Sequence, residues 1–278
     1  MKAIVALVAV VLASSGGAVQ DASQYVETRQ QPGGGYAEPG GKATPGLTAW
    51  AVIGLRAAGT PPASLAEARA YLADAADELR SLTEAELVLT ALAKLGAPPP
   101  PLVQRVRAAV RPNGAIGPTL NATVWGIVSL RAAGEPAPSG SAAYLLRHQH
   151  RSGGWSWAVG GAPDSNDTAA AVLALRAAGL RAKRPAIVRA LRYLRGLQKR
   201  DGGFELVRGR GSDVQSTAWA VQAFLAAGAR PGAAAYRYLS RMQRADGSLR
   251  YSARYAVTPV WVTAQALPAL ARTPLTRR

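Results

Sequence analysis

Two acidic side chains stand close enough in the sequence to act together, in the run Asp164-Ser165-Asn166-Asp167-Thr168. Two carboxyl groups in different environments can serve as a general acid and a general base. The alternative is structural, because Asp167 or Asn166 directly precedes an apolar stretch and could cap the helix that follows. Asp213 precedes another apolar stretch and invites the same capping interpretation.

The chain offers few residues for metal or nucleophilic chemistry. It has no cysteine, which excludes disulfides, thiolate catalysis and cysteine-ligated metals. Its two histidines, His148 and His150, lie two residues apart, so they point to different faces of a helix. A usual zinc site needs three or four ligands. We therefore expect no metal and no other cofactor.

A helical pair with a glycine turn, over residues 186–228, is the unit that must position these groups. The first helix places Leu191, Leu194 and Leu197 three apart, which indicates one buried face and one wet face. The pair Gly202-Gly203 ends it, since glycine reaches backbone angles closed to other residues. The second helix is apolar nearly all round, and such a helix is normally buried on all sides. Each unit therefore pairs an outer helix that is exposed to solvent on one face with an inner helix that is buried on all sides.

The same unit recurs along the chain with a period of 37 to 49 residues, within the range of helical-pair repeats. A sixth inner helix, over residues 258–267, has lost the glycine that closes the others. The closing glycines are Gly59, Gly96, Gly134, Gly179 and Gly228. Outer helices are expected over residues 65–79, 102–110, 142–150, 186–199 and 234–242, with a short one ending near Gln31.

Counted back from the closing glycine, the inner helices share further positions. Arginine stands three residues before the glycine in several copies, where a cation meets the negative end of the helix dipole. A second shared position, here called the aromatic register, is often a tryptophan. We expect its side chain to pack between the inner and outer layers, with ligand contact as the alternative. The aromatic register holds Trp50, Leu87, Trp125, Ala170, Trp219 and Trp261, and two residues earlier stand Thr48, Ala85, Thr123, Thr168, Thr217 and Pro259. The arginines are Arg56, Arg131 and Arg176.

These repeats predict an all-α protein with one domain over residues 19–278. A repeat of this kind cannot bury its inner helix alone, and association with neighbouring repeats solves this. About six inner and six outer helices could close into a ring, which leaves no end to cap. The expected fold is therefore a closed α/α toroid.

The glycine turns resemble the QW-type repeats of the squalene and oxidosqualene cyclases. The matching residues are Tyr193-Leu194, Gln198 and Gly202-Gly203-Phe204, and, in the preceding unit, Tyr144-Leu145, Gln149 and Gly153-Gly154-Trp155. The run from Asp213 to Trp219 resembles the inner-helix starts of those cyclases and of protein prenyltransferase β subunits. This resemblance, to the terpenoid cyclase and protein prenyltransferase repeat superfamily, covers nearly all of the mature chain. It implies an α/α toroid with inner helices around a funnel.

The resemblance does not carry the chemistry of those enzymes with it. Class II cyclases protonate their substrate with the middle aspartate of an Asp-x-Asp-Asp-Thr run, and that position holds Asn166 here, whose amide cannot act as the general acid. Protein prenyltransferases bind zinc through an Asp-x-Cys segment and a later histidine. Here the segment is Asp213-Val214-Gln215, and Thr258 stands near the place of the histidine. A tetrahedral zinc site of that type is therefore not expected.

Residues 1–18 are predicted to be a secretory signal peptide. A charged start, Met1-Lys2, precedes an apolar run over residues 3–13, with small residues at Gly16 and Ala18 for cleavage. The run is too short to span a bilayer comfortably, and no later stretch is typical of a transmembrane helix. We therefore expect a secreted or cell-envelope protein with no transmembrane span in the mature chain.

The formal net charge of +17 is carried mostly by arginine. It indicates either a generally basic surface or attraction to an anionic surface such as a cell wall or lipid headgroups. The arginines are spread over many helices instead of clustered, so specific nucleic-acid binding is not expected.

Two functions are consistent with these features. The first is a non-catalytic binder of a large, partly apolar small molecule, isoprenoid- or cobalamin-like, or a scaffold for an envelope partner protein. Cobalamin carriers of the intrinsic factor and transcobalamin group use a similar α6/α6 barrel. The second is a diverged terpenoid cyclase or prenyltransferase-type enzyme that uses Asp164 or Asp167.

A ligand is expected at the rim where the inner helices begin. Helix N-termini offer free amide donors and a positive dipole end, and aromatic rings in the adjoining turns offer flat apolar surface. The candidate ligand-binding residues are Tyr36, Asn121, Trp155, Trp157, Asn166, Asp167 and Asp213.

Overall fold

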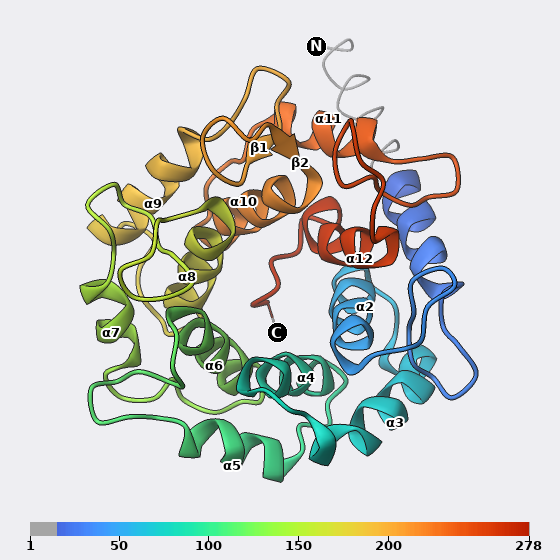
Figure 1. Ribbon diagram of the computed structural model, residues 1–278, viewed down its shortest axis with the longest axis horizontal. Coiled ribbons are helices and arrows are strands. Elements are labelled where there is room, and N and C mark those ends of the chain that lie inside the picture. The colour runs from blue at the N-terminus through green and yellow to red at the C-terminus, as the bar shows by residue number, and fades with distance from the viewer. Residues whose placement is uncertain (1–15, 278) are drawn as a thin grey trace, which may run out of the picture.

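Helices without a polar face form the inner layer of the structure, a computed structural model that describes residues 16–277. Each inner helix packs against the next in chain order, and the last packs against the first, so the layer closes into a ring (Figure 1). The inner helices are α2 (Pro45–Ala58), α4 (Leu82–Lys94), α6 (Leu120–Ala132), α8 (Ser165–Ala177), α10 (Val214–Ala226) and α12 (Pro259–Leu270).

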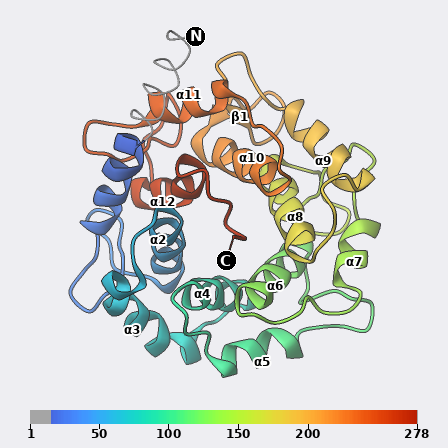
Figure 2. The same cartoon turned by 180° about the vertical axis from the view of Figure 1, so that it is seen from behind.

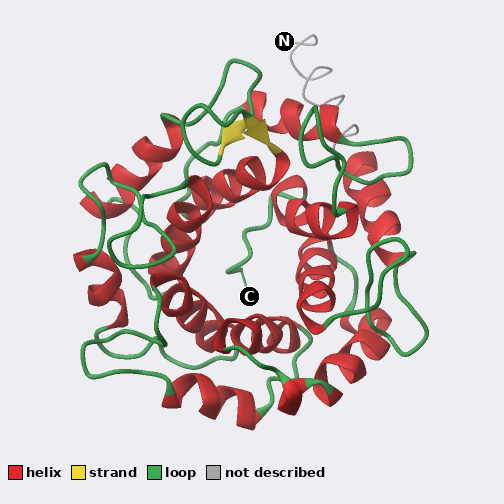
Figure 3. Ribbon diagram, viewed as in Figure 1, coloured by secondary structure: helices red, strands yellow, loops and turns green. Residues whose placement is uncertain are grey.

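Amphipathic helices surround this ring as an outer layer, and the two layers are concentric in Figure 3. Within the described residues the sheet consists of two short strands, β1 (Phe204–Glu205) and β2 (Ser212–Asp213). The expected closed α/α toroid is confirmed. The outer helices are residues 16–27, α3 (Ala66–Asp74) between the 3-10 turns η1 (Pro62–Leu65) and η2 (Ala76–Glu78), α5 (Pro100–Ala108), α7 (Ser141–Arg147), α9 (Pro185–Arg195) and α11 (Ala233–Met242).

The seam of the ring lies where α2 meets α12, which come from opposite ends of the sequence. A Cβ atom added at Gly54 would lie 2.4 Å from the carbonyl oxygen of Ala264. Only a glycine therefore allows the two backbones to approach this closely. Viewed from behind, the chain continues from α12 into the centre of the ring (Figure 2), where Leu275 is buried.

The arginine register joins neighbouring inner helices, which goes beyond the predicted interaction with the helix dipole. Each arginine donates from Nε to a carbonyl at the end of the next inner helix, and from Nη1 to a carbonyl just after its own helix. One side chain thus satisfies carbonyl groups at the ends of two helices. The Nε bonds run from Arg56 to Lys94 (3.1 Å), from Arg131 to Ala177 (3.0 Å) and from Arg176 to Ala226 (2.9 Å). The Nη1 acceptors are Thr60, Glu135 and Leu180.

The glycine turns lock each outer helix against the next one. In the unit over residues 186–228, Nε2 of Gln198 donates to the carbonyl of Gly202 at 3.0 Å. Gly202 has a φ of 91°, and a Cβ atom there would lie 2.3 Å from the carbonyl oxygen of Ala234 in α11. The outer layer closes in a similar way, since Nε2 of Gln243 donates to the carbonyl of Ala18 at 2.8 Å. A turn at Gly114, bridged by Val110 and Ile116, is one that the sequence analysis does not predict.

The threonine register fastens each turn to its inner helix, and it corrects the alignment of α12. The hydroxyl of Thr217 accepts the N–H of Phe204 at 2.9 Å, and the same bond recurs at Thr48, Thr123 and Thr168. In α12 the hydroxyl that accepts, from Leu249, belongs to Thr263 and not to the position of Pro259. The predicted register is therefore wrong by four residues in this copy, and Gln265 takes the place assigned to Trp261.

The inner helices α2, α4, α6, α8 and α10 each begin on a residue whose side chain caps the helix. Asp213 caps α10, as predicted, by accepting the N–H of Ser216 at 2.6 Å. Neither Asp167 nor Asn166 caps α8, because Asp164 holds that position and accepts the N–H of Asp167. Likewise α6 begins on Thr119, so Asn121 lies within the first turn of the helix.

Residues 1–15 of the predicted signal peptide lie outside the described residues, and the helix over residues 16–27 passes the predicted cleavage site at Ala18. Among the helices of residues 16–277, none combines the length and the apolar character needed to cross a bilayer.

Glu86 is a buried acid in α4 without a hydrogen-bond partner. It is 0% exposed, neither carboxyl oxygen is paired, and it lies against Gly126 and Ile116. Burial raises its pKa well above the ordinary value, so the folded protein keeps a proton that the unfolded chain releases as the pH rises above about 4.3.

Replacing Glu86 by methionine should therefore stabilise the protein. We expect a gain of about 1–3 kcal/mol in the free energy of unfolding near pH 7, because an unpaired buried polar group is removed. The gain should shrink as the pH falls towards 4, where both states of the wild type are protonated. Urea denaturation of both proteins at pH 4, 6 and 8 measures it, and a gain that does not change with pH would contradict the assigned titration.

Candidate ligand-binding site

The N-terminal ends of the inner helices gather at one rim, as expected, and enclose a cavity of about 250 Å³, here called the mouth cavity. Every inner helix contributes a side chain from its first turns. The cavity is lined by Trp50, Thr83, Leu87, Asn121, Trp125, Asn166, Asp167, Ala170, Gln215, Trp219, Trp261 and Gln265.

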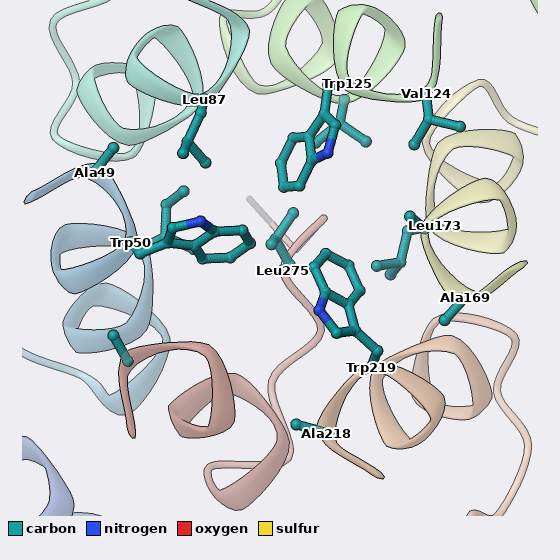
Figure 4. Close-up of a cluster of buried hydrophobic side chains, with 14 of the residues drawn as sticks. Ala49, Trp50, Leu87, Val124, Trp125, Ala169, Leu173, Ala218, Trp219 and Leu275 are labelled. Carbon is teal, nitrogen blue, oxygen red and sulfur yellow. The ribbon is translucent and has the colours of Figure 1, made fainter. Parts of the chain in front are cut away.

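Tryptophans form the floor of the mouth cavity. Trp50 meets Trp125, Trp219 and Trp261 edge to face, with ring centroids 5.5, 5.8 and 6.1 Å apart. Figure 4 shows Trp50, Trp125 and Trp219 pointing toward one another around Leu275, which comes from the segment after α12. The aromatic register thus packs across the axis of the ring, and the predicted packing between the inner and outer layers is wrong. Edge-to-face contacts of this kind stabilise the cluster beyond its buried area.

Polar side chains form the wall of the mouth cavity above this floor. Four of them, Thr83, Asn121, Asn166 and Gln215, stand four residues before the aromatic register, on the same helix face. Oε1 of Gln265 accepts from Nε2 of Gln215 at 2.8 Å and from Nε1 of Trp219 at 3.3 Å. The cavity therefore presents amide groups above indole rings.

Asp167 is the acidic group of the mouth cavity. Its Oδ1 accepts from Nδ2 of Asn121 at 3.0 Å. Burial and the nearby negative charge of Asp164 raise the pKa of Asp167 to about 7, against the effect of the Asn121 hydrogen bond. Burial also raises the pKa of Asp164. Near neutral pH the pair therefore retains a proton, because two close carboxylates resist double ionisation.

Loops from the next unit occupy amide groups at the helix N-termini, so the expected free donors are largely used. The N–H of Asn121 donates to the carbonyl of Trp157 at 3.1 Å, and that of Val214 to the carbonyl of Tyr251 at 2.8 Å. The carboxylate of Glu38 accepts the N–H groups of Val260 and Trp261. Recognition in the cavity consequently depends on side chains.

A comparison with protein families finds a match to part of this chain. Residues 143–256 match the squalene-hopene cyclase C-terminal domain. This segment contains the glycine turns at Gly153, Gly202 and Gly247 and the inner helices α8 and α10, so the repeat resemblance seen in the sequence is confirmed. A comparison with curated proteins finds no match.

Solved structures extend the cyclase-type fold over nearly the whole chain. The type II terpene cyclase MstE from Scytonema superposes with a TM-score of 0.72 at 18% identity, over 96% of this chain and 99% of that one. A protein from Actinoplanes gives 0.69 at 20% identity, over 93% and 99% of the two chains. A glycosidase gives 0.67 at 14% identity, over 95% and 98%. At these identities the similarity establishes the α/α toroid alone.

The structure of this cyclase-type toroid brings only some of the candidate residues together. Asn121, Asn166 and Asp167 line the mouth cavity. Trp157 lies outside it on a rim loop, with 60% of its surface exposed. Asp164, the other candidate acid, caps α8 next to Asp167.

The remaining candidates have structural contacts that leave no ligand-facing surface. Tyr36 and Trp155 are each 1% exposed, and Nε1 of Trp155 donates to the carbonyl of Leu145 at 2.8 Å. Asp213 is buried as a cap, with both carboxyl oxygens bonded to Ser216. Their positions therefore do not support ligand contact.

Three further residues line the mouth cavity and were not predicted as site residues: Thr83, Gln215 and Gln265. A signal for two of them exists, since Thr83 and Gln215 precede the aromatic register by four residues. Gln265 has no such signal, because its place in the ring depends on the shifted register of α12.

Each histidine forms a hydrogen bond with a residue near it in the sequence. Nδ1 of His148 lies 2.8 Å from the carbonyl oxygen of Tyr144, and Nδ1 of His150 lies 2.8 Å from Oγ of Ser152. Over the part of the chain that the structure describes, no cluster of three or more metal-binding side chains is found. That the protein needs no metal stays a prediction.

Proposed function

We propose that this protein is an exported, non-catalytic binder whose mouth cavity receives one end of a large, partly apolar molecule. The observation that carries the proposal is the set of amide side chains above an indole floor. Ligand sites commonly combine apolar and aromatic walls with a few placed polar groups. The export part rests on the predicted signal peptide.

The rim loops support a ligand larger than the cavity itself. Large apolar side chains are exposed on two separate loops at the mouth, one before α8 and one before α12. Trp157, Tyr255 and Val257 are 60%, 50% and 53% exposed. A polar end held by Asn121 and Gln215 would leave the apolar body of the ligand against these loops.

The size of the cavity favours binding over cyclisation. Small-molecule sites usually measure about 300–1,000 Å³, whereas the mouth cavity measures about 250 Å³. Trp50, Trp125, Trp219 and Leu275 fill the axis below it. An isoprenoid chain could therefore not be enclosed whole, as a cyclisation reaction requires.

One observation favours the enzyme as a second candidate. Asp167 faces the cavity with a pKa of about 7, which suits a general acid near neutral pH. With Asn166 beside it, Asp167 would be the only carboxyl among the cavity-lining residues able to donate a proton.

The binding proposal predicts a selective effect of Gln215→Ala. Native mass spectrometry of the gently purified protein reports a retained ligand, and titration calorimetry with farnesol and cyanocobalamin represents the two ligand classes. Loss of one neutral hydrogen bond should weaken binding about threefold to tenfold. Gln24→Ala, an exposed change on the first outer helix, should leave affinity unchanged. Equal losses in both variants, or no retained ligand and no binding of either probe, would overturn the proposal.

Asp167→Asn separates binder from enzyme. With farnesol as the candidate substrate and mass spectrometry of extracted products, the binder yields no product from wild type and keeps its affinity in the variant. An enzyme would yield cyclised product from wild type, and loss of its general acid should lower the rate about a hundredfold or more.

A further inference from the structure

A second and larger cavity lies on the opposite rim, where the inner helices end. It measures about 610 Å³ and is here called the basic pocket. Four cationic residues line it: Arg56 at the end of α2, Lys94 at the end of α4, Arg131 at the end of α6, and Arg277 after α12. The volume is in the usual range for a small-molecule site.

The charged side chains of the basic pocket are all cationic, and they face the negative ends of the inner-helix dipoles. No described acidic residue lines it, and Arg56 and Lys94 form no ion pair with a described residue. Nζ of Lys94 donates to the carbonyl of Arg277 at 3.0 Å, which leaves further donors on the same ammonium. Burial and the charge of Arg56 lower the pKa of Lys94 to about 8, as expected for cations held together in a partly desolvated place.

Beside the cations and the threonines Thr273 and Thr276, the wall of the basic pocket has a part made of small apolar side chains. Ala57, Ala93, Ala132 and Ala177 come from four successive inner helices, and Leu275 comes from the segment after α12. These residues leave room beside the cations for a flat or short apolar group.

We propose that the basic pocket binds an organic phosphate, with the phosphoryl group at Arg56, Lys94 and Arg277 and a short apolar part against the alanines. Several converging cations suit a group with more than one negative charge, and guanidinium and ammonium groups are the usual partners of phosphate. The site is separate from the mouth cavity and does not depend on the function proposed there.

The test is titration calorimetry with phenyl phosphate and inorganic phosphate. Wild type should bind phenyl phosphate more tightly than inorganic phosphate, because only the ester reaches the alanine wall. Lys94→Gln should weaken phenyl phosphate about tenfold to a hundredfold, the usual effect of losing a charge-assisted hydrogen bond. Ala132→Leu, which fills the pocket and leaves its charge unchanged, should also weaken it about tenfold or more. Thermal unfolding of each variant without ligand checks that it folds.

Lys42→Gln is the matched control, since it removes the same charge from an exposed lysine just before α2, at the mouth rim. Equal weakening by Lys94→Gln and Lys42→Gln would show attraction by net charge alone and overturn the proposal, as would no binding by wild type. Vesicles of phosphatidylglycerol identify the source of the phosphate. Binding to vesicles that is lost only in Lys94→Gln and Ala132→Leu would assign the phosphate to a lipid headgroup.

Discussion

Replacing Trp50 by alanine should lower the free energy of unfolding by about 3–5 kcal/mol. Its indole is 4% exposed and contacts three other indoles at the axis of the ring. Inner helices joined by arginine bonds and by the Gly54 contact cannot collapse into the void that alanine would leave. Urea denaturation followed by circular dichroism measures the loss.

Trp157→Ala is the control for this prediction. That ring is 60% exposed on a rim loop, so its loss should change stability by no more than about 0.5 kcal/mol. Similar losses from both variants would mean that the central indole cluster contributes no more than a surface residue. The same pair tests the site, because Trp157→Ala should reduce ligand affinity without reducing stability.

Gly202→Ala should destabilise the protein by about 2–5 kcal/mol. The residue adopts a φ of 91°, which costs an L-residue about 1–2 kcal/mol. The added methyl would also lie 2.3 Å from the carbonyl oxygen of Ala234, and such overpacking costs about 1–3 kcal/mol. Both costs arise because the turn is held between two outer helices.

Gly209→Ala isolates the backbone part of that loss. Gly209 has nearly the same φ, 90°, but a Cβ atom there would meet no atom within 4 Å. We expect only about 1–2 kcal/mol of destabilisation. Thermal and urea unfolding of the two variants give the comparison, and equal losses would show that the contact between outer helices adds nothing.

The centre of the ring differs from the centre that the resemblance to the cyclases implies. The resemblance implies a funnel, whereas the axis here is filled by three indoles and by Leu275. The space that remains is divided between a small cavity at the mouth and a basic pocket at the opposite rim. Two small sites of different chemistry therefore stand in place of one large chamber.

The sequence by itself determined the ring, its two layers and most of its turns, although not the turn at Gly114. Apolar residues that recur with a period of 3.6 show which helices expose one face to solvent. Closing glycines such as Gly179 set the length of each repeat. The turn residues could be predicted because their chemistry is local: Gln198 bonds a glycine only four residues away. These features depend on neighbours in the chain, and a sequence pattern reports them directly.

Only the tertiary structure decided which side chains meet at the axis. An inner helix is apolar on nearly all sides, so its sequence does not single out the face that turns inward. That rotation is set by contacts from distant segments, such as Gly54 against Ala264 and Gln215 against Gln265. Whether an amide at a helix N-terminus is free also depends on a distant segment. The N–H of Asn121, for example, donates to the carbonyl of Trp157 in the next unit.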